Sequence, residues 1–188
     1  MTEEDLLDKL EEMQMQMEES IEHLQREMVK VRTGKASTST FNGILVDYYG
    51  SPTPLNQVAN VAVADAKTIT IQPWEKTMLG PIEKAIFEAN LGLTPMNDGE
   101  LIRITIPPLT EERRRELGKK VKQLGEDAKV SIRNSRKMGM DAIKKAVKAG
   151  YPEDAGKRKE DEVQKSTDAF SSKINALVEA KDKEIMKV

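Results

Sequence analysis

The chain has 188 residues, of which 33% are charged and only 4% aromatic, and it contains no cysteine. The lack of cysteine excludes disulfides and thiolate zinc sites, and the Glu/Lys/Arg-rich stretches favour long helices with a thin apolar seam. The formal net charge is only −2, so bulk composition suggests no polyanionic partner. The start of the chain is acidic, and no apolar run approaches the roughly 18 residues of a membrane span. We therefore expect a cytoplasmic protein without a membrane partner.

Residues 2–31 are expected to form one long helix. Thr2 precedes three acidic residues, as is typical of a helix N-terminus, and Gly34 is expected to close the other end. Ten acidic and three basic residues give the segment 1–31 a net charge of −7. Apolar residues recur at steps of three and four along one side of this helix: Leu6, Leu10, Met13, Met17, Ile21, Leu24, Met28 and Val31.

Residues 32–108 show a different pattern. Alternating apolar residues predict short strands at 44–48, 68–71 and 101–106. Turn-forming residues occupy 50–54 and 97–99, and a short helix is expected over 81–90, stopped by Gly92. This segment is therefore expected to be a small α/β module, a sandwich of the β/α/β kind.

Two further long helices are expected in the rest of the chain. The second begins at Thr110, because Pro107 and Pro108 end the preceding strand, and it runs to about Ala149. A third helix is expected from Glu153. Apolar stripes mark both helices: Leu117, Val121, Leu124, Ala128, Ile132, Ser135, Ala142 and Ala146 in the second, and Val163, Thr167, Phe170, Ile174, Leu177 and Ile185 in the third.

Each of these helices has a single narrow seam, which three helices can bury against one another. The predicted fold class is therefore α+β. A long antiparallel three-helix bundle is expected from residues 1–31 and 109–188, with the module 32–108 inserted into it. Linkers near 31–35 and 105–109 are expected to act as a hinge: Arg32, Thr33, Gly34, Lys35, Thr105, Ile106, Pro107 and Pro108.

The second long helix is strongly basic, with thirteen basic and six acidic residues over 110–149 and a net charge of +7. At 100° per residue, nine cations fall in a sector of about 120° away from the apolar stripe. Such a face can be merely solvated, but its one-sidedness and its arginines favour phosphate binding. Without aromatic side chains, it would read the shape and charge of folded RNA. The nine residues are Arg115, Lys119, Lys122, Lys129, Arg133, Arg136, Lys137, Lys144 and Lys148.

The sequence offers no catalytic site. The single histidine, His23, lies on the acidic helix and is expected to be solvated. There is no Gly-rich phosphate loop, nucleophile motif or carboxylate cluster. We expect a binding protein and not an enzyme, with no cofactor or metal. Gly118, Gly125 and Gly139 are spaced at multiples of seven residues, and either close helix approach or local bending would explain them.

Several uncommon segments resemble the ribosome recycling factor family over essentially the full length of the chain. The family often has Arg at the positions of Lys35 and Lys137, so the charge is kept here and the bidentate fork is lost. The segments that carry the resemblance are Arg32-Thr33-Gly34-Lys35-Ala36, YYGSPTPL at 48–55, Pro73-Trp74-Glu75, Leu91-Gly92-Leu93, IPPLTEERR at 106–114 and IRNSRK at 132–137.

The resemblance implies an L-shaped monomer with the dimensions of a transfer RNA. It implies binding to the large-subunit rRNA of a bacterial-type 70S ribosome after termination, with Arg133 as the leading contact and Arg136 and Lys137 beside it. Elongation factor G with GTP would then act on the bound protein, the subunits would separate, and mRNA and deacylated tRNA would be released.

Two other readings stay open at this point. Long helices can serve a chaperone-like or structural scaffold, in which case the basic face would only aid solubility. A general RNA- or DNA-binding arm without preference for the ribosome is the second alternative.

Overall fold

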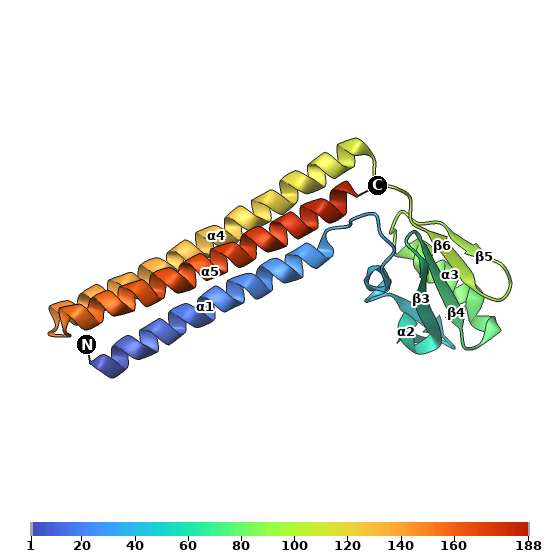
Figure 1. The fold of residues 1–188 in the computed structure, drawn as a ribbon. Coiled ribbons are helices and arrows are strands. Elements are labelled where there is room, and N and C mark those ends of the chain that lie inside the picture. The colour runs from blue at the N-terminus through green and yellow to red at the C-terminus, as the bar shows by residue number, and fades with distance from the viewer. Residues whose placement is uncertain (1, 188) are drawn as a thin grey trace. The chain divides into compact units, whose positions relative to one another are not determined.

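A computed structural model describes residues 2–187 and divides the chain into two compact units. The first unit contains the residues up to Thr33 and those from Thr110 onward, and the second contains Gly34–Leu109. Figure 1 shows the elements of each unit.

The first unit consists of three long helices, α1 (Glu3–Lys30), α4 (Glu111–Lys148) and α5 (Glu153–Met186). Helix α4 runs antiparallel to both α1 and α5 (Figure 1). The apolar stripes face one another, and Leu6 and Ile132 are fully buried. The predicted three-helix bundle is therefore confirmed.

Side-chain caps fix where α1 and α4 begin. The Thr2 Oγ1 accepts a hydrogen bond from the Asp5 backbone N–H at 3.1 Å, and the Thr2 N–H donates to Asp5 Oδ2 at 2.7 Å. The Thr110 Oγ1 caps α4 by accepting a hydrogen bond from the Arg113 N–H at 3.1 Å. These are the first-turn donors that a helix cannot satisfy internally.

The expectation that Gly34 closes α1 is wrong. The helix ends at Lys30, and the next residue, Val31, has an extended backbone with ψ 114°. Val31 is 3% exposed, so the chain leaves the helix with its last seam residue still packed in the core. Gly34 has a φ of +77° but belongs to the second unit.

The second unit contains two antiparallel sheets, two α-helices and two short 3-10 helices, at Thr38–Phe41 and Lys76–Met78. A hairpin is formed by β1 (Leu45–Tyr48) and β2 (Ser51–Pro54). The four-stranded sheet has the order β3-β4-β6-β5. Its strands are β3 (Ala59–Asp65), β4 (Thr68–Pro73), β5 (Pro95–Asn97) and β6 (Ile102–Thr105), and the α-helices are α2 (Leu55–Val58) and α3 (Leu79–Glu88).

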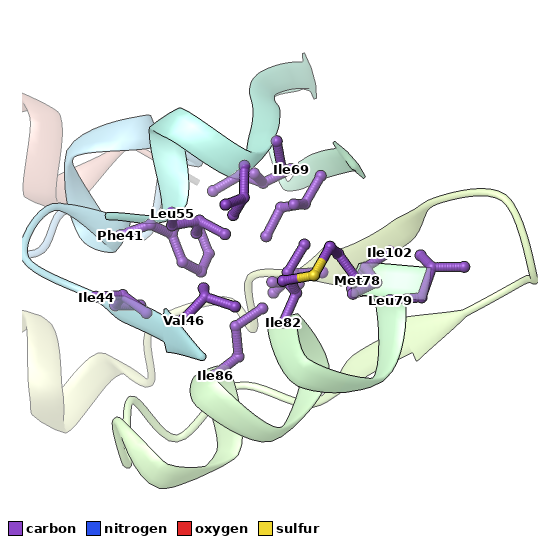
Figure 2. Close-up of a cluster of buried hydrophobic side chains, with 14 residues drawn as sticks. Phe41, Ile44, Val46, Leu55, Ile69, Met78, Leu79, Ile82, Ile86 and Ile102 are labelled. Atoms are coloured by element: carbon purple, nitrogen blue, oxygen red, sulfur yellow. The ribbon is translucent and has the colours of Figure 1, made fainter. Parts of the chain in front are cut away.

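The core of this unit lies where α3, the sheet and the hairpin meet. Figure 2 shows Val46 of β1, Ile69 of β4 and Ile82 and Ile86 of α3 pointing toward one another. All four side chains are at most 1% exposed. Each such buried aliphatic side chain stabilises the fold by about 1.5–3 kcal/mol relative to exposure.

The predicted strands at 44–48, 68–71 and 101–106 correspond to β1, β4 and β6, whereas β2, β3 and β5 were not predicted. The turn predicted over 50–54 is wrong beyond Gly50. Tyr49 and Gly50 form the turn with positive φ, and Ser51–Pro54 pairs with β1. Helix α3 begins earlier than predicted and ends at Glu88, because Asn90 takes the left-handed conformation with φ +50°.

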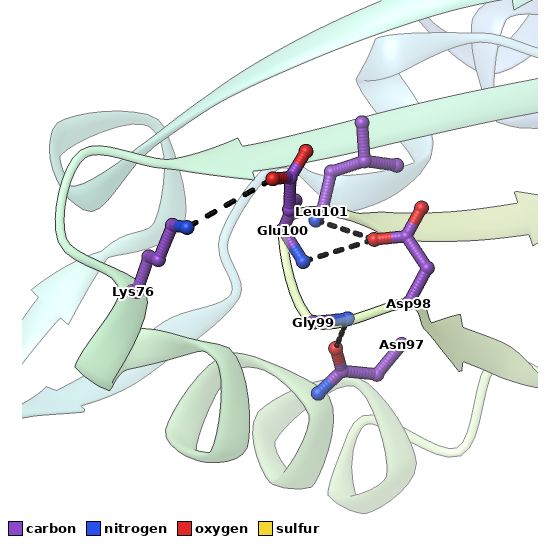
Figure 3. A network of polar contacts seen from close by, with 6 residues as sticks. All are labelled: Lys76, Asn97, Asp98, Gly99, Glu100 and Leu101. Atoms are coloured by element: carbon purple, nitrogen blue, oxygen red, sulfur yellow. Dashed lines mark hydrogen bonds and ion pairs between the residues drawn. The ribbon is translucent and has the colours of Figure 1, made fainter.

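The turn predicted at 97–99 lies one residue later, because Asn97 ends β5 and the turn runs from Asp98 to Leu101, where the Asp98 N–H donates to the Leu101 carbonyl at 3.2 Å. The Asp98 Oδ1 accepts hydrogen bonds from the backbone N–H groups of Leu101 at 2.9 Å and Glu100 at 3.0 Å (Figure 3). Asn97 Oδ1 accepts a third from Gly99. The Leu101 N–H, followed by that of Glu100, lowers the pKa of Asp98 below its ordinary value of 3.8.

The β5–β6 turn is therefore expected to be sensitive to acid. Its stabilisation by the Asp98 carboxylate is fully present above the ordinary pKa of 3.8 and is lost as the pH falls through the lowered folded-state pKa. An NMR titration should give a midpoint below 3.8 for this carboxyl group, with the Leu101 amide losing protection from exchange over the same range. A midpoint at or above 3.8 would contradict these hydrogen bonds.

The glycines of α4 allow the neighbouring helices to approach closely. A Cβ on Gly125 would lie 2.5 Å from Val178 Cγ2 of α5, and one on Gly139 would overlap Met13 Sδ of α1. At Gly118 the nearest atom, Asp182 Oδ1, is 3.4 Å away. Close approach therefore explains Gly125 and Gly139, the choice that the sequence left open.

Alanine at these three positions should separate packing from helix propensity. Gly125→Ala should lower the free energy of unfolding by about 1–3 kcal/mol, because Val178 is stiff at χ1 and cannot turn aside easily. Gly139→Ala should cost less, since the Met13 side chain is flexible. Gly118→Ala should be neutral or stabilise by up to about 1 kcal/mol through helix propensity. Urea unfolding measures all three, and equal effects would contradict the close-approach account.

Candidate nucleic-acid interface

The structure places most of the predicted cations on the solvent side of α4. Seven are exposed: Arg115, Lys119, Lys122, Arg133, Lys137, Lys144 and Lys148. We refer to these seven residues as the basic face. Lys129 and Arg136 are half-buried and lie outside it.

Little of the basic face is neutralised within the molecule. Arg115 forms an ion pair with Glu111 at 3.1 Å, while Lys129, outside the face, pairs with Glu126 at 3.6 Å. Within residues 2–187 the other six members of the face form no ion pair: Lys119, Lys122, Arg133, Lys137, Lys144 and Lys148. These cations remain available to an external anion.

Arg136 does not point outward as expected. Its Nε donates a hydrogen bond to Gln164 Oε1 of α5 at 2.9 Å, and Gln164 Nε2 donates to Asp168 Oδ1 at 2.9 Å. On a helical wheel Arg136 shares its angle with Gly118, which lies on the side of α4 that packs against α5. The sector buried by α5 is therefore wider than the apolar stripe predicted.

The outward face of α1 has the opposite charge. A shallow depression on this helix is lined by Met15, which is 63% exposed, together with several acidic residues. The bundle thus presents negative charge on one helix and positive charge on another, and a polyanion would be attracted to α4 and repelled by this face of α1. The acidic residues are Asp8, Glu11, Glu12, Glu18, Glu19 and Glu22.

Sequence reasoning missed a groove of about 460 Å³ along the contact of α1 and α4. Lys137 of the basic face lines it, as do Lys9 of α1 and Lys145 of α4. No local pattern in the sequence signals it, because Lys9 lies far from the other lining residues along the chain.

His23 is exposed, as expected. Over residues 2–187, no group of three or more His, Cys, Asp or Glu side chains is placed to hold a metal ion. The same residues contain no helix that is long and apolar enough to cross a membrane.

Comparisons with known proteins agree on one family. The family described as Ribosome recycling factor matches residues 24–186. A ribosome-recycling factor from Flavobacterium psychrophilum is 55% identical over 172 residues, covering 92% of each chain. One from Oleidesulfovibrio alaskensis is 53% identical over 178 residues, covering 94% of this chain and 97% of that protein.

Two solved structures are similar over 100% of both chains, each with 41% sequence identity. A solution structure of ribosome recycling factor gives a TM-score of 0.77. The second gives a TM-score of 0.63 and comes from models of the T. thermophilus ribosome recycling factor and E. coli elongation factor G bound to the E. coli post-termination complex.

Two arginine variants of the isolated protein should test whether Arg133 lies in solvent while Arg136 packs against α5. Arg136→Ala should lower the free energy of unfolding by about 1 kcal/mol, because it leaves Gln164 without its donor. Arg133→Ala should leave stability unchanged to within about 0.5 kcal/mol, because the side chain is exposed and unpaired. Thermal unfolding followed by circular dichroism measures both, and a larger loss for Arg133→Ala than for Arg136→Ala would contradict the assignment.

Proposed function

The chain belongs to the ribosome recycling factor family, and from this premise we propose that it splits the post-termination ribosome together with elongation factor G and GTP. Separation of the subunits would release mRNA and deacylated tRNA. The support comes from the family match and from the solved relative placed on a post-termination complex with elongation factor G. The protein would work as a monomer in the bacterial cytoplasm.

The observation that carries this proposal is the row of six unpaired cations on α4. Side chains in register along a straight helix can meet successive phosphates of an RNA backbone, and each contact releases condensed counterions. Arg133 would be the leading contact with large-subunit rRNA, because its planar guanidinium can bind a phosphate with two hydrogen bonds. Lys119, Lys122, Lys137, Lys144 and Lys148 would extend the contact along the helix.

On this proposal the protein is a translation factor without a reaction of its own. GTP hydrolysis would take place on elongation factor G, so this chain needs neither a nucleotide site nor a catalytic residue. Its contribution would be mechanical, by binding tightly to rRNA and transmitting the action of its partner.

A fall in light scattering when bacterial post-termination ribosomes receive the protein, elongation factor G and GTP would report splitting. The fall should require all three additions. Arg133→Ala should reduce ribosome affinity by about tenfold or more, because a charge-assisted contact contributes about 1.5–3 kcal/mol. Arg26→Ala, an exposed arginine on acidic α1, is the matched control and should behave as wild type. Full splitting by Arg133→Ala at limiting concentration would contradict the proposal.

The unit boundaries, between Thr33 and Gly34 and between Leu109 and Thr110, support a second part of the proposal. The linkers at 31–35 and 105–109 would let the two units move relative to each other when elongation factor G acts.

Because the chain has no cysteine, dyes can be placed on Glu19→Cys in the first unit and Lys84→Cys in the second, both at exposed positions. Energy transfer between the dyes on ribosome-bound protein should change on addition of elongation factor G and GTP. An unchanged transfer efficiency during productive splitting would rule out hinge motion.

A further inference from the structure

The groove beside the contact of α1 and α4 is lined by Lys9 of α1 and by six residues of α4. Lys9 stands on the α1 side, and Lys137 and Lys145 stand on α4. Ala142 and Met138 lie between them, and Ala142 is 5% exposed. The volume of about 460 Å³ is within the range of small-ligand sites.

The charges around the groove favour an anion. Lys145 is exposed and, within the described residues, has no ion pair. Lys9 is partly neutralised by Glu12, whose Oε2 lies 2.6 Å from its Nζ, so most of the positive charge comes from the unpaired Lys137 and Lys145. Lys137 belongs to both the groove and the basic face, so an anion bound along that face can continue into the groove.

The remaining lining residues suit a base and a sugar better than phosphate alone. Asn134 offers an amide that can both donate and accept hydrogen bonds, and Asp141 offers a carboxylate that only accepts. A carboxylate would repel a phosphate, but it can accept a hydrogen bond from a ribose 2′-OH or from an exocyclic amino group. Met138 provides a polarizable surface against which a base can pack.

We propose that this groove binds one unpaired ribonucleotide of the RNA strand whose phosphates lie along the basic face. Lys9 and Lys145 hold the flanking phosphates, Asn134 and Asp141 meet the base edge or the 2′-OH, and the base rests on Met138 and Ala142. The proposal rests on the proposed function. It adds a contact to a particular RNA structure, which the basic face alone cannot provide because phosphates carry no sequence information.

The first test identifies what enters the groove. A photo-cross-linker on Met138→Cys should, on the ribosome, attach to an unpaired rRNA nucleotide, which nuclease digestion and reverse transcription locate. The same reagent on Met15→Cys, on the acidic face of α1, should give no RNA adduct. An adduct to a ribosomal protein, to a base-paired nucleotide, or to nothing at all overturns the proposal.

The second test measures affinity for ribosomes over a series of salt concentrations. Lys145→Ala and Lys9→Ala should each weaken binding about threefold to tenfold and reduce the salt slope by about one, since each loses one phosphate contact. Lys120→Ala, an exposed lysine of α4 outside the groove, and Lys30→Ala are the controls. Lys30 forms a 2.6 Å ion pair with Glu27 like that of Lys9, and both controls should weaken binding less than twofold.

Asn134→Ala gives a different signature. It should weaken binding severalfold without changing the salt slope, because the lost contact is uncharged. If Lys145→Ala, Lys9→Ala and Asn134→Ala all bind as wild type while Arg133→Ala loses affinity, the groove proposal fails and the proposed function stands. If Arg133→Ala also binds as wild type, the proposed function fails.

Discussion

The packing of α4 between α1 and α5 is the constraint on which the rest of the bundle depends. Gly125 and Gly139 leave no room for a Cβ, so the helices on either side approach closely. This approach buries the seam of α4, including Val121, Ile132 and Ile143, to at most 1% exposure. A helix with thirteen basic residues in its segment could not pack so tightly unless nearly all of its charges lay on the other side. The close packing of the helices therefore also explains why the cations of α4 lie on its outward face.

The same constraint explains why the charges stay apart. Cations on the outward face of α4 cannot reach the acids on the outward face of α1 across a close-packed seam. Six of them consequently remain without an ion pair in the described chain. Mutual repulsion along α4 costs some stability, and an RNA backbone bound there as proposed would remove that cost. The near-zero net charge of the chain hides this separation.

Periodicity and caps in the sequence were enough to predict the bundle, because steps of three and four at Leu6–Val31 fit only a helix seam. Thr110 after two prolines marked the start of α4 to the residue. The β2 and β5 strands could not be predicted, since Ser51–Pro54 reads as a turn and Pro95–Asn97 is too short for alternation to show. The β3 strand was missed although Val61 and Val63 alternate in it. The pairing of these strands is decided by tertiary contacts.

The basic face was predictable from a helical wheel, but Arg136 was not. A helical wheel gives the angle of a side chain but does not show how much of the helix surface a neighbouring helix covers. Here Gln164 of α5 extends far enough around α4 to accept a hydrogen bond from Arg136. The α1–α4 groove was not predicted from the sequence for a related reason. Lys9 and Lys145 line the same groove only because the two helices are antiparallel, and nothing local in the sequence joins them.

A cryo-electron microscopy map of the protein on a post-termination ribosome would test the central claim most directly. The account predicts that the α4 side chains from Lys119 to Lys148 face rRNA phosphates, with Arg133 in contact and the acidic face of α1 turned away. A map in which α1 or α5 lies against rRNA, with the basic face in solvent, would contradict it.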